Sequence, residues 1–137
     1  MKVIILNWNC YPDTLECVNS FLETDSARLD DIIIVDNGSS DNSVTEIRNE
    51  YPEVILLPAK ENLGYAGGNN LGIKYALEKN ADSILICNPD VRVTEGCIQE
   101  LEKKITDHGV GIVGPKIKYL TDGNNTNIFW EIGGNIH

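Results

Sequence analysis

Short polar side chains follow several apolar runs of this sequence, at the places where those runs end. Asn7-Trp8-Asn9 follows the first run, Asp36 follows the second, and Asn88-Pro89-Asp90 follows the fourth. A carboxylate such as Asp36 can accept hydrogen bonds from a base N–H or a ribose hydroxyl. A single carboxylate such as Asp90 can hold Mg²⁺ when phosphates and water complete its coordination shell. These residues are therefore candidates for binding a ligand that carries hydroxyl and phosphate groups.

A glycine-rich segment, Asn62 to Asn70 (NLGYAGGNN), leads from the third apolar run into a helical pattern. Its glycines would let the backbone approach a ligand closely, and the amino end of the helix favours an anion such as a diphosphate. Tight packing of the helix on a sheet explains the same glycines equally well. The segment is not a Walker loop, because it lacks Gly-Lys-Ser.

Each of these strand ends also has an interpretation without a ligand. For Asn37 to Asp41 we favour a turn that caps the next helix, but for Asp36 itself we favour a ligand-binding role, because a cap is available without it. Asn88 to Val91 is an ordinary type I turn sequence. Trp8 could stack on a base or pack on a helix with equal ease.

Other candidates are weaker. His108 and His137 are expected to be solvated, and Cys10 and Cys17 to serve as small buried hydrophobes without a redox role.

The apolar runs predict the elements that position these residues. They are short, uninterrupted and rich in branched side chains, which is typical of strands buried on both faces of a parallel sheet. Helical spacing of apolar residues separates them. The five predicted strands are Val3 to Leu6, Ile32 to Val35, Val54 to Leu57, Ile84 to Cys87 and Gly111 to Val113.

This alternation predicts an α/β fold: an open, mostly parallel, doubly wound sheet with helices on both faces. Ligands then bind beyond the carboxyl ends of the strands. We expect an α/β domain over residues 1–118. Residues 119–137 should form a loop, centred on Leu120 to Asn127, and the start of an incomplete second part that ends in an exposed aromatic run at Phe129 and Trp130.

Composition and charge exclude several classes of protein. The 137 residues include 11 basic and 21 acidic side chains, a net charge of −10 that would repel nucleic acid. The four cysteines form no C-x-x-C pair and no basic-then-apolar leader precedes the first run, so we expect reduced thiols in the cytoplasm. No apolar stretch approaches the roughly 20 residues that a membrane span needs.

Taken together, four motifs resemble those of the family 2 glycosyltransferases. They are the Asn7-Trp8-Asn9 strand end, Ile34 to Asp41 (IVDNGSSD), Glu61 to Ile73 (ENLGYAGGNNLGI) and Asn88 to Val91 (NPDV), in the family's order from Lys2 to about Lys118. The rhamnosyltransferase-like branch is the most similar. The resemblance implies a GT-A fold, with a nucleotide-binding half followed by an acceptor-binding half.

The resemblance also implies a role for each matched residue. It places Asn7 and Asn9 beside the base, Asp36 on the base or ribose, and Asn62, Gly64 and Asn70 near the nucleotide. Asp90 corresponds to the last carboxylate of the family's D-x-D motif, which holds a divalent metal, Mg²⁺ or Mn²⁺, on the donor diphosphate. Asn88, which stands where that motif usually opens with Asp, is a neutral and weaker ligand.

The implied activity is inverting transfer of a sugar from a nucleotide-diphosphate donor, most readily UDP- or dTDP-linked, to the hydroxyl of a carbohydrate or lipid-linked acceptor in cell-wall or polysaccharide biosynthesis. The family's acidic catalytic base is expected beyond His137, as if the chain were truncated after its donor-binding half. The site would lie in the cytoplasm, at the inner face of the membrane.

The alternative is a non-catalytic nucleotide-binding or oligomerising module, for example a homodimer. A nicotinamide dehydrogenase is disfavoured, because G-x-G-x-x-G is missing after the first strand.

Overall fold

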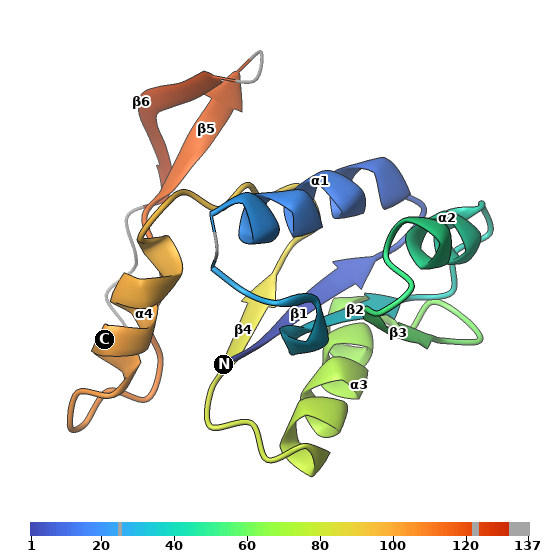
Figure 1. The fold of residues 1–137 in the computed structure, drawn as a ribbon, viewed down its shortest axis with the longest axis horizontal. Helices are drawn as coiled ribbons and strands as arrows, with labels where there is room; N and C mark the ends of the chain where they lie inside the picture. The colour runs from blue at the N-terminus through green and yellow to red at the C-terminus, as the bar shows by residue number, and fades with distance from the viewer. Residues whose placement is uncertain (25, 122–123, 132–137) are drawn as a thin grey trace. The chain divides into compact units, whose positions relative to one another are not determined.

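The computed structural model of the chain describes residues 1–24, 26–121 and 124–131 (Figure 1). It divides into two compact units, Met1–Gly96 and Cys97–His137. The first unit contains β1 (Lys2–Asn7), α1 (Tyr11–Glu23), the 3-10 helix η1 (Leu29–Asp31), β2 (Ile32–Asp36), α2 (Ser43–Glu50), β3 (Ile55–Pro58), α3 (Gly64–Glu78) and β4 (Ile84–Cys87).

The four strands of this unit form one parallel sheet in the order β3-β2-β1-β4. Figure 1 shows α1 and α2 on one face of the sheet and α3 on the other. The predicted α/β fold with a parallel sheet and helices on both faces is therefore confirmed. The first four of the five predicted strands also match, except that β3 lies one residue later than the apolar run Val54 to Leu57.

The two central strands provide the core. Ile4 of β1 and Ile33 and Val35 of β2 are fully buried, as is Ala76 of α3, and these four residues form one packed cluster. Full burial of such an aliphatic side chain contributes about 1.5–3 kcal/mol. The outer strands are less covered: Ile86 of β4 is 45% exposed. Burial on both faces thus holds for β1 and β2 but not for the two outer strands.

Glycines allow α3 to lie close against the sheet. A Cβ atom on Gly72 would come within 2.7 Å of a methyl carbon of Ile4, and one on Gly68 within 2.4 Å of Leu6. Atoms of a real core do not approach so closely, so an added Cβ atom would force the facing Ile4 or Leu6 side chain to move. Packing therefore accounts for these two glycines.

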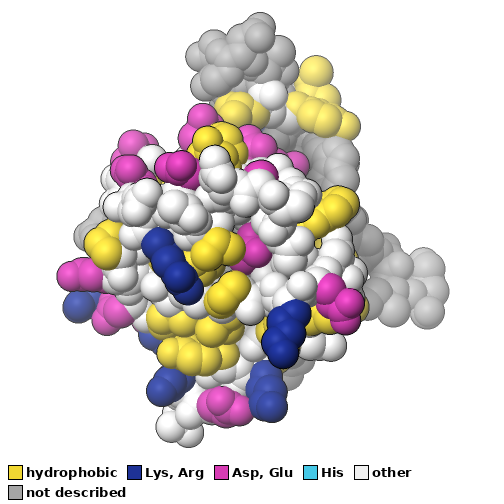
Figure 2. Space-filling model, turned by 90° about the vertical axis from the view of Figure 1, so that its right-hand side faces the viewer, with side chains coloured by type: hydrophobic (Ala, Val, Ile, Leu, Met, Phe, Trp, Pro, Cys, Tyr) yellow, Lys and Arg dark blue, Asp and Glu magenta, His cyan; other side chains and the backbone are white. Residues whose placement is uncertain are grey.

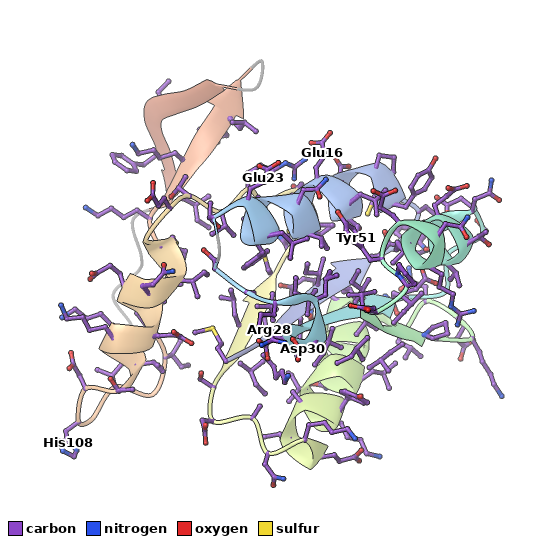
Figure 3. All side chains as sticks on the ribbon, viewed as in Figure 1. Glu16, Glu23, Arg28, Asp30, Tyr51 and His108 are labelled. Carbon is purple, nitrogen blue, oxygen red and sulfur yellow. The ribbon has the colours of Figure 1, made fainter. Side chains whose placement is uncertain are left out.

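On the opposite face, α1 and α2 are linked through Tyr51, which lies between them in Figure 3. Its hydroxyl lies 2.5 Å from the side-chain oxygen of Asn19, to which it donates a hydrogen bond. This bond ties the end of α2 to the middle of α1, and so helps to fix the two helices that cover this face of the sheet.

The second unit contains α4 (Cys97–Ile105) and an antiparallel hairpin of β5 (Ile117–Thr121) and β6 (Asn124–Glu131). His108 is exposed just beyond α4 and points away from that helix in Figure 3, as predicted. His137 lies outside the described residues.

Two predictions for this part of the chain were wrong. The run Gly111 to Val113 is not a strand, and Ile112 is 90% exposed. Glycine weakens strands, and Pro115 two residues later lacks the N–H that a ladder needs, which outweighs the apolar pattern. The polar stretch Leu120 to Asn127 is not simply a loop, because Leu120 pairs with Asn125 and Thr121 with Asn124. This pairing joins backbone N–H and C=O groups, so the polar side chains of the stretch do not prevent it.

Candidate functional site

The carboxylate of Asp36 is the centre of a buried hydrogen-bond network at the carboxyl end of the parallel sheet. The register pairs Asn7 of β1 with Asp36 of β2, and both residues are almost fully buried. The Asn7 side-chain amide donates to Asp36 Oδ1 over 2.7 Å, and the hydroxyl of Ser39 donates to the same oxygen over 2.6 Å. The Ser39 backbone N–H donates to Asp36 Oδ2 over 3.1 Å. These bonds compensate for burying a charge that would otherwise be costly.

The other end of the Asn7 side chain is held as well. Its Oδ1 accepts a hydrogen bond from the hydroxyl of Thr14, over 2.8 Å, and one from the thiol of Cys10, over 3.5 Å. Thr14 lies in α1 and is itself fully buried. The network therefore fixes the start of α1 against the ends of the two central strands.

Asn9 ties the turn after β1 to the turn after β2. Its backbone has φ of +52°, and its side-chain oxygen accepts hydrogen bonds from the backbone N–H groups of Ser40 (2.8 Å) and Asp41 (3.3 Å). Its own N–H donates to the hydroxyl of Ser39 over 2.9 Å. Asn7, Asn9 and Asp36, for which the family resemblance implies a place at the base and ribose, thus lie in one connected network.

Asn37, directly after Asp36, holds the loop that leads into α3. Its buried side chain donates to Asn62 Oδ1 (3.0 Å) and to the Gly64 carbonyl (3.2 Å), and it accepts from the Leu63 N–H (3.0 Å). The next residue, Gly38, has φ of +73°, and a Cβ atom there would lie 2.5 Å from the backbone of Glu61. Asn62 and Gly64 are thereby brought to the same edge of the sheet as Asp36.

Asn70, the last predicted residue of the glycine-rich segment, is exposed on α3. Its neighbour Asn69 is buried, and its side-chain N–H donates to the Tyr65 carbonyl over 2.9 Å. The Asn69 Oδ1 has no hydrogen-bond partner among the described residues. A buried acceptor of this kind ordinarily binds water or a ligand group, since leaving it unpaired costs free energy.

The segment after β4 lies on the other side of β1. Asn88 and Asp90 are exposed, and the Val91 N–H donates to the Asn88 carbonyl over 3.3 Å, so the predicted turn is present. Two inter-strand spacings, about 10 Å, separate β2 from β4 across β1. Asp36 and Asp90 therefore lie at the same edge of the sheet, on either side of the end of β1.

Arg92 links this turn to α1. Its guanidinium donates to the carbonyls of Pro89 (3.4 Å) and Val91 (3.1 Å) and forms an ion pair with Glu16. Glu16 lies on the outer side of α1 in Figure 3. The turn that carries Asp90 is thus held from the side of α1.

Two buried thiols lie beneath the same turn. The sulfur atoms of Cys17 and Cys87 are 3.9 Å apart, and that of Cys17 lies 3.6 Å from the Asn88 carbonyl oxygen. The hydrogen bond with Cys87, together with burial, raises the pKa of the Cys17 thiol. Because a thiol that stays protonated is a poor nucleophile, this agrees with the structural role predicted for Cys17.

The strands of Figure 1 point toward the face shown in Figure 2. On that face, acidic side chains and the side chains of Lys or Arg lie among exposed hydrophobic side chains. Trp8, at the end of β1, is 53% exposed, and Tyr65, at the start of α3, is 61% exposed. Both rings are therefore available for contact with a ligand.

Sequence reasoning missed the residues that hold the network together, above all Asn37 and Ser39. Both were assigned to an ordinary turn. The spacing Asp-x-x-Ser was a usable signal, because an Asp side chain commonly bonds to backbone N–H groups two or three residues later. No signal of this kind exists for Thr14, whose role depends on where α1 packs.

Among the described residues, every helix is too short or too polar to span a membrane. No group of three or more His, Cys, Asp and Glu side chains in residues 1–24, 26–121 and 124–131 is arranged to hold a metal ion. A shallow, open groove lies elsewhere on the first unit, between β3 and α3, and is lined by Leu57, Pro58, Leu71, Lys74, Tyr75 and Glu78.

Comparison with known proteins gives a consistent family. The profile of the family described as "Glycosyl transferase family 2" matches residues 2–132. The low-salt glycan biosynthesis hexosyltransferase Agl10 of Haloferax volcanii is 29% identical over 120 residues, which are 85% of this chain and 36% of that protein.

Two further relatives carry more specific names. The N-acetylglucosaminyl-diphospho-decaprenol L-rhamnosyltransferase of Mycobacterium tuberculosis is 33% identical over 78 residues, 51% of this chain and 25% of that protein. The dTDP-rhamnosyl transferase RfbF of Shigella flexneri is 29% identical over 84 residues, 61% of this chain and 28% of that protein. The chain thus spans well under half the length of these relatives.

Proposed function

The chain belongs to glycosyl transferase family 2, and on that premise we propose that it binds the nucleotide-diphosphate sugar from which a glycosyl group is transferred, with inversion, to an acceptor hydroxyl. One observation carries this proposal: Asn7, Asn9, Asp36, Asn62 and Gly64, which are distant in the sequence, meet in one network at the carboxyl edge of a parallel sheet. Ligands of open α/β sheets bind at that edge.

Within this site, Asp36 would recognise the nucleoside. Its Oδ1 already accepts two hydrogen bonds. Within the described part of the chain, its Oδ2 accepts one hydrogen bond, from the Ser39 N–H, and has acceptor capacity left. A base N–H or a ribose hydroxyl would complete it. Asn7 contributes indirectly, because its side chain is buried and bonded within the protein. The name of the Shigella relative supports a dTDP-linked donor, whose thymine presents the same hydrogen-bonding edge as the uracil of UDP.

Asp90 fits a role at the donor diphosphate. It is exposed at the sheet edge, and the neighbouring Asn88 is exposed as well. A divalent cation such as Mg²⁺ or Mn²⁺ takes one or two protein carboxylates and completes its shell with phosphate oxygens and water, so this donor set suits it. When bound, the metal would neutralise the charge of the departing nucleoside diphosphate. Asp90 and Asn88 would hold it there.

The acceptor side follows from the relatives' names alone. The Mycobacterium relative acts on a decaprenol-linked sugar, which supports a carbohydrate or lipid-linked acceptor in polysaccharide or cell-wall assembly. We place the reaction in the cytoplasm, at the inner face of the membrane, where such an acceptor and a nucleotide sugar can meet. We assign no catalytic base within the chain.

A second candidate function is favoured by the hairpin of the second unit. Ile128 is 65% exposed, Tyr119 is 49% exposed and Phe129 is 40% exposed. Exposed apolar side chains concentrated on one hairpin are typical of an interface. An oligomerising module, for instance a homodimer, would use them. Light scattering distinguishes the two functions, because a pure assembly module forms a stable oligomer that does not respond to nucleotides.

The direct test is isothermal titration of the chain with dTDP, UDP and GDP, each with and without Mn²⁺. We expect dTDP or UDP to bind, and Mn²⁺ to strengthen the binding. GDP serves as the control for general attraction to a diphosphate. A folded sample that binds none of the three nucleotides contradicts the proposal.

A further inference from the structure

The hydroxyl of Ser39 has every one of its hydrogen-bonding positions in use. A serine hydroxyl offers one hydrogen and two lone pairs. The Asn7 side-chain amide (3.1 Å) and the Asn9 backbone N–H (2.9 Å) both approach the Ser39 oxygen, and both groups can only donate. The lone pairs are therefore occupied, and the single hydrogen is left for Asp36 Oδ1, 2.6 Å away.

This arrangement fixes the direction of the bond to Asp36. Because the two N–H donors occupy the oxygen, the hydroxyl cannot rotate to accept from elsewhere without losing a contact. The Ser39 backbone N–H holds the second carboxylate oxygen over 3.1 Å. One residue thus contacts both oxygens of Asp36, and the plane of the carboxylate is set by it.

The same hydroxyl joins the two turns of the sheet edge. Asn9 belongs to the turn after β1, and Ser39 to the turn after β2. Bonds to a carboxylate are stronger than bonds between neutral groups. The Ser39 hydroxyl therefore orients Asp36 and does not cap α2. At the start of α2, the Ser43 backbone N–H donates instead to the Asp41 carboxylate.

From this geometry we propose that Ser39 is a positioning residue for donor binding: it orients the Asp36 carboxylate so that Oδ2 is presented to the nucleoside. The inference rests on the proposed function, since it concerns the same site. It adds a requirement that the family membership does not supply, namely that the hydroxyl of Ser39, and not only its small size, is needed.

The test measures the affinity for dTDP, by titration calorimetry of the full chain, in a matched pair of variants. Ser39→Thr keeps the hydroxyl and adds a methyl group. Ser39→Val has nearly the same shape as Ser39→Thr but carries a methyl group in place of the hydroxyl. We expect Ser39→Thr to bind within about threefold of the unaltered chain and Ser39→Val to bind about tenfold more weakly, the effect of one lost charge-assisted hydrogen bond. Asn42→Ala, an exposed neighbour whose side chain makes no cap hydrogen bond to α2, is the control.

A double-mutant cycle separates positioning from a merely structural role. If Ser39 acts through the Asp36 carboxylate, Ser39→Ala weakens dTDP binding about tenfold in the unaltered chain but by less than about twofold in an Asp36→Asn background. Circular dichroism checks that each variant is folded, and the Thr and Val pair decides the matter if Ser39→Ala is not.

The outcomes are distinct. If the unaltered chain binds neither dTDP nor UDP, the proposed function fails and the inference with it. If the chain binds dTDP and Ser39→Val binds equally well, or the loss from Ser39→Ala is the same in both backgrounds, the positioning role is refuted while the proposed function stands.

Discussion

The two edges of the parallel sheet hold polar side chains in different ways. At the carboxyl edge, Asn7, Asp36 and Asn37 are at least 97% buried and bonded to one another or to adjacent turns. At the amino edge, Lys2 forms an ion pair with Asp31 over 2.7 Å, and the side chains remain 22% and 34% exposed. Exposed ion pairs contribute about 0–1 kcal/mol, whereas breaking a buried network costs more.

This difference indicates what each edge is for. The partly exposed ion pair of Lys2 and Asp31 lies at the amino edge, and replacing it should change the free energy of unfolding little. Burying a carboxylate that still has unused acceptor capacity costs free energy of folding. Because the fold itself does not need a charge there, this cost is best explained by ligand binding. We interpret the carboxyl edge as preorganised for a ligand and the amino edge as structural.

The largest expected effect is that of Asp36→Asn. The amide places an N–H where the carboxylate accepted a hydrogen bond, so a donor of Asn7 or Ser39 then faces another donor. We expect dTDP binding to weaken about 100-fold and the free energy of unfolding to fall by about 1–3 kcal/mol, measured by calorimetry and by urea denaturation.

Asp31→Asn, at the amino edge, is its matched control. The same chemical change there should leave dTDP affinity unaltered and lower the free energy of unfolding by no more than about 1 kcal/mol. Equal losses of dTDP affinity at the two edges would remove the distinction between them.

Gly38→Ala should produce the next largest effect. The added Cβ would be strained by the positive φ and would also lie 2.5 Å from the backbone of Glu61, so the loop before α3 must move. We expect a loss of at least about 2 kcal/mol in the free energy of unfolding, together with weaker dTDP binding.

Gly96→Ala separates the two causes. Gly96 has a similar φ of +77°, but no atom of the described residues lies within 4 Å of the added atom. It should lose only the strain of the backbone conformation, about 1 kcal/mol. If the two variants are equally destabilised, close contact with the loop before α3 is not what requires Gly38.

Asp90→Asn tests the metal and compares the two ends of β4. Asp90 is exposed just after this strand, and Asp82 is exposed just before it. We expect Asp90→Asn to abolish the gain in dTDP affinity that Mn²⁺ provides, about tenfold, without a change in stability. Asp82→Asn should leave that gain intact. Retention of the full Mn²⁺ effect in Asp90→Asn would exclude Asp90 as the metal ligand.

The smallest effect concerns the thiols beneath the carboxyl edge. The pKa of Cys17 is raised above its ordinary value of 9.0, so the folded chain holds this proton more tightly than the unfolded chain. Its contribution to stability is therefore complete below about pH 9 and is lost as the pH rises further.

Denaturation with urea at several pH values checks this behaviour. Above pH 9, the free energy of unfolding should fall by up to about 1.4 kcal/mol per pH unit more steeply in the unaltered chain than in Cys17→Ala. Parallel curves for the two proteins would show that the thiol is not protected.

The sequence predicted the parallel sheet because its strands are uninterrupted apolar runs, and such runs have few alternatives once helices separate them. The prediction of secondary structure was wrong in two segments whose local composition is typical of another structure. Gly111 to Val113 has strand-like residues but glycine and proline neighbours, and the paired ends of β5 and β6 include the polar residues Thr121, Asn124 and Asn125. The Asp122-Gly123 pair is a common hairpin turn sequence and was the available signal for that hairpin.

For the site, the sequence identified the residues at the strand ends but not the bonds among them. Asp36 and Asp90 could be placed at one edge because parallel strands end together. Asn37 binds the loop before α3, and Ser39 contacts both oxygens of Asp36. Both contacts depend on how three turns pack against each other. Spacing alone does not determine such packing.

The central claim is that the donor binds at the carboxyl edge of the sheet. Backbone amide NMR shifts recorded during titration of the chain with dTDP, followed by addition of paramagnetic Mn²⁺, test it most directly. We predict that dTDP shifts the amides of Ser39 and Gly64, and that Mn²⁺ broadens the amide of Asp90 first. Shifts confined to Lys2 at the amino edge, or to Lys74 and Tyr75 in the groove between β3 and α3, would contradict it.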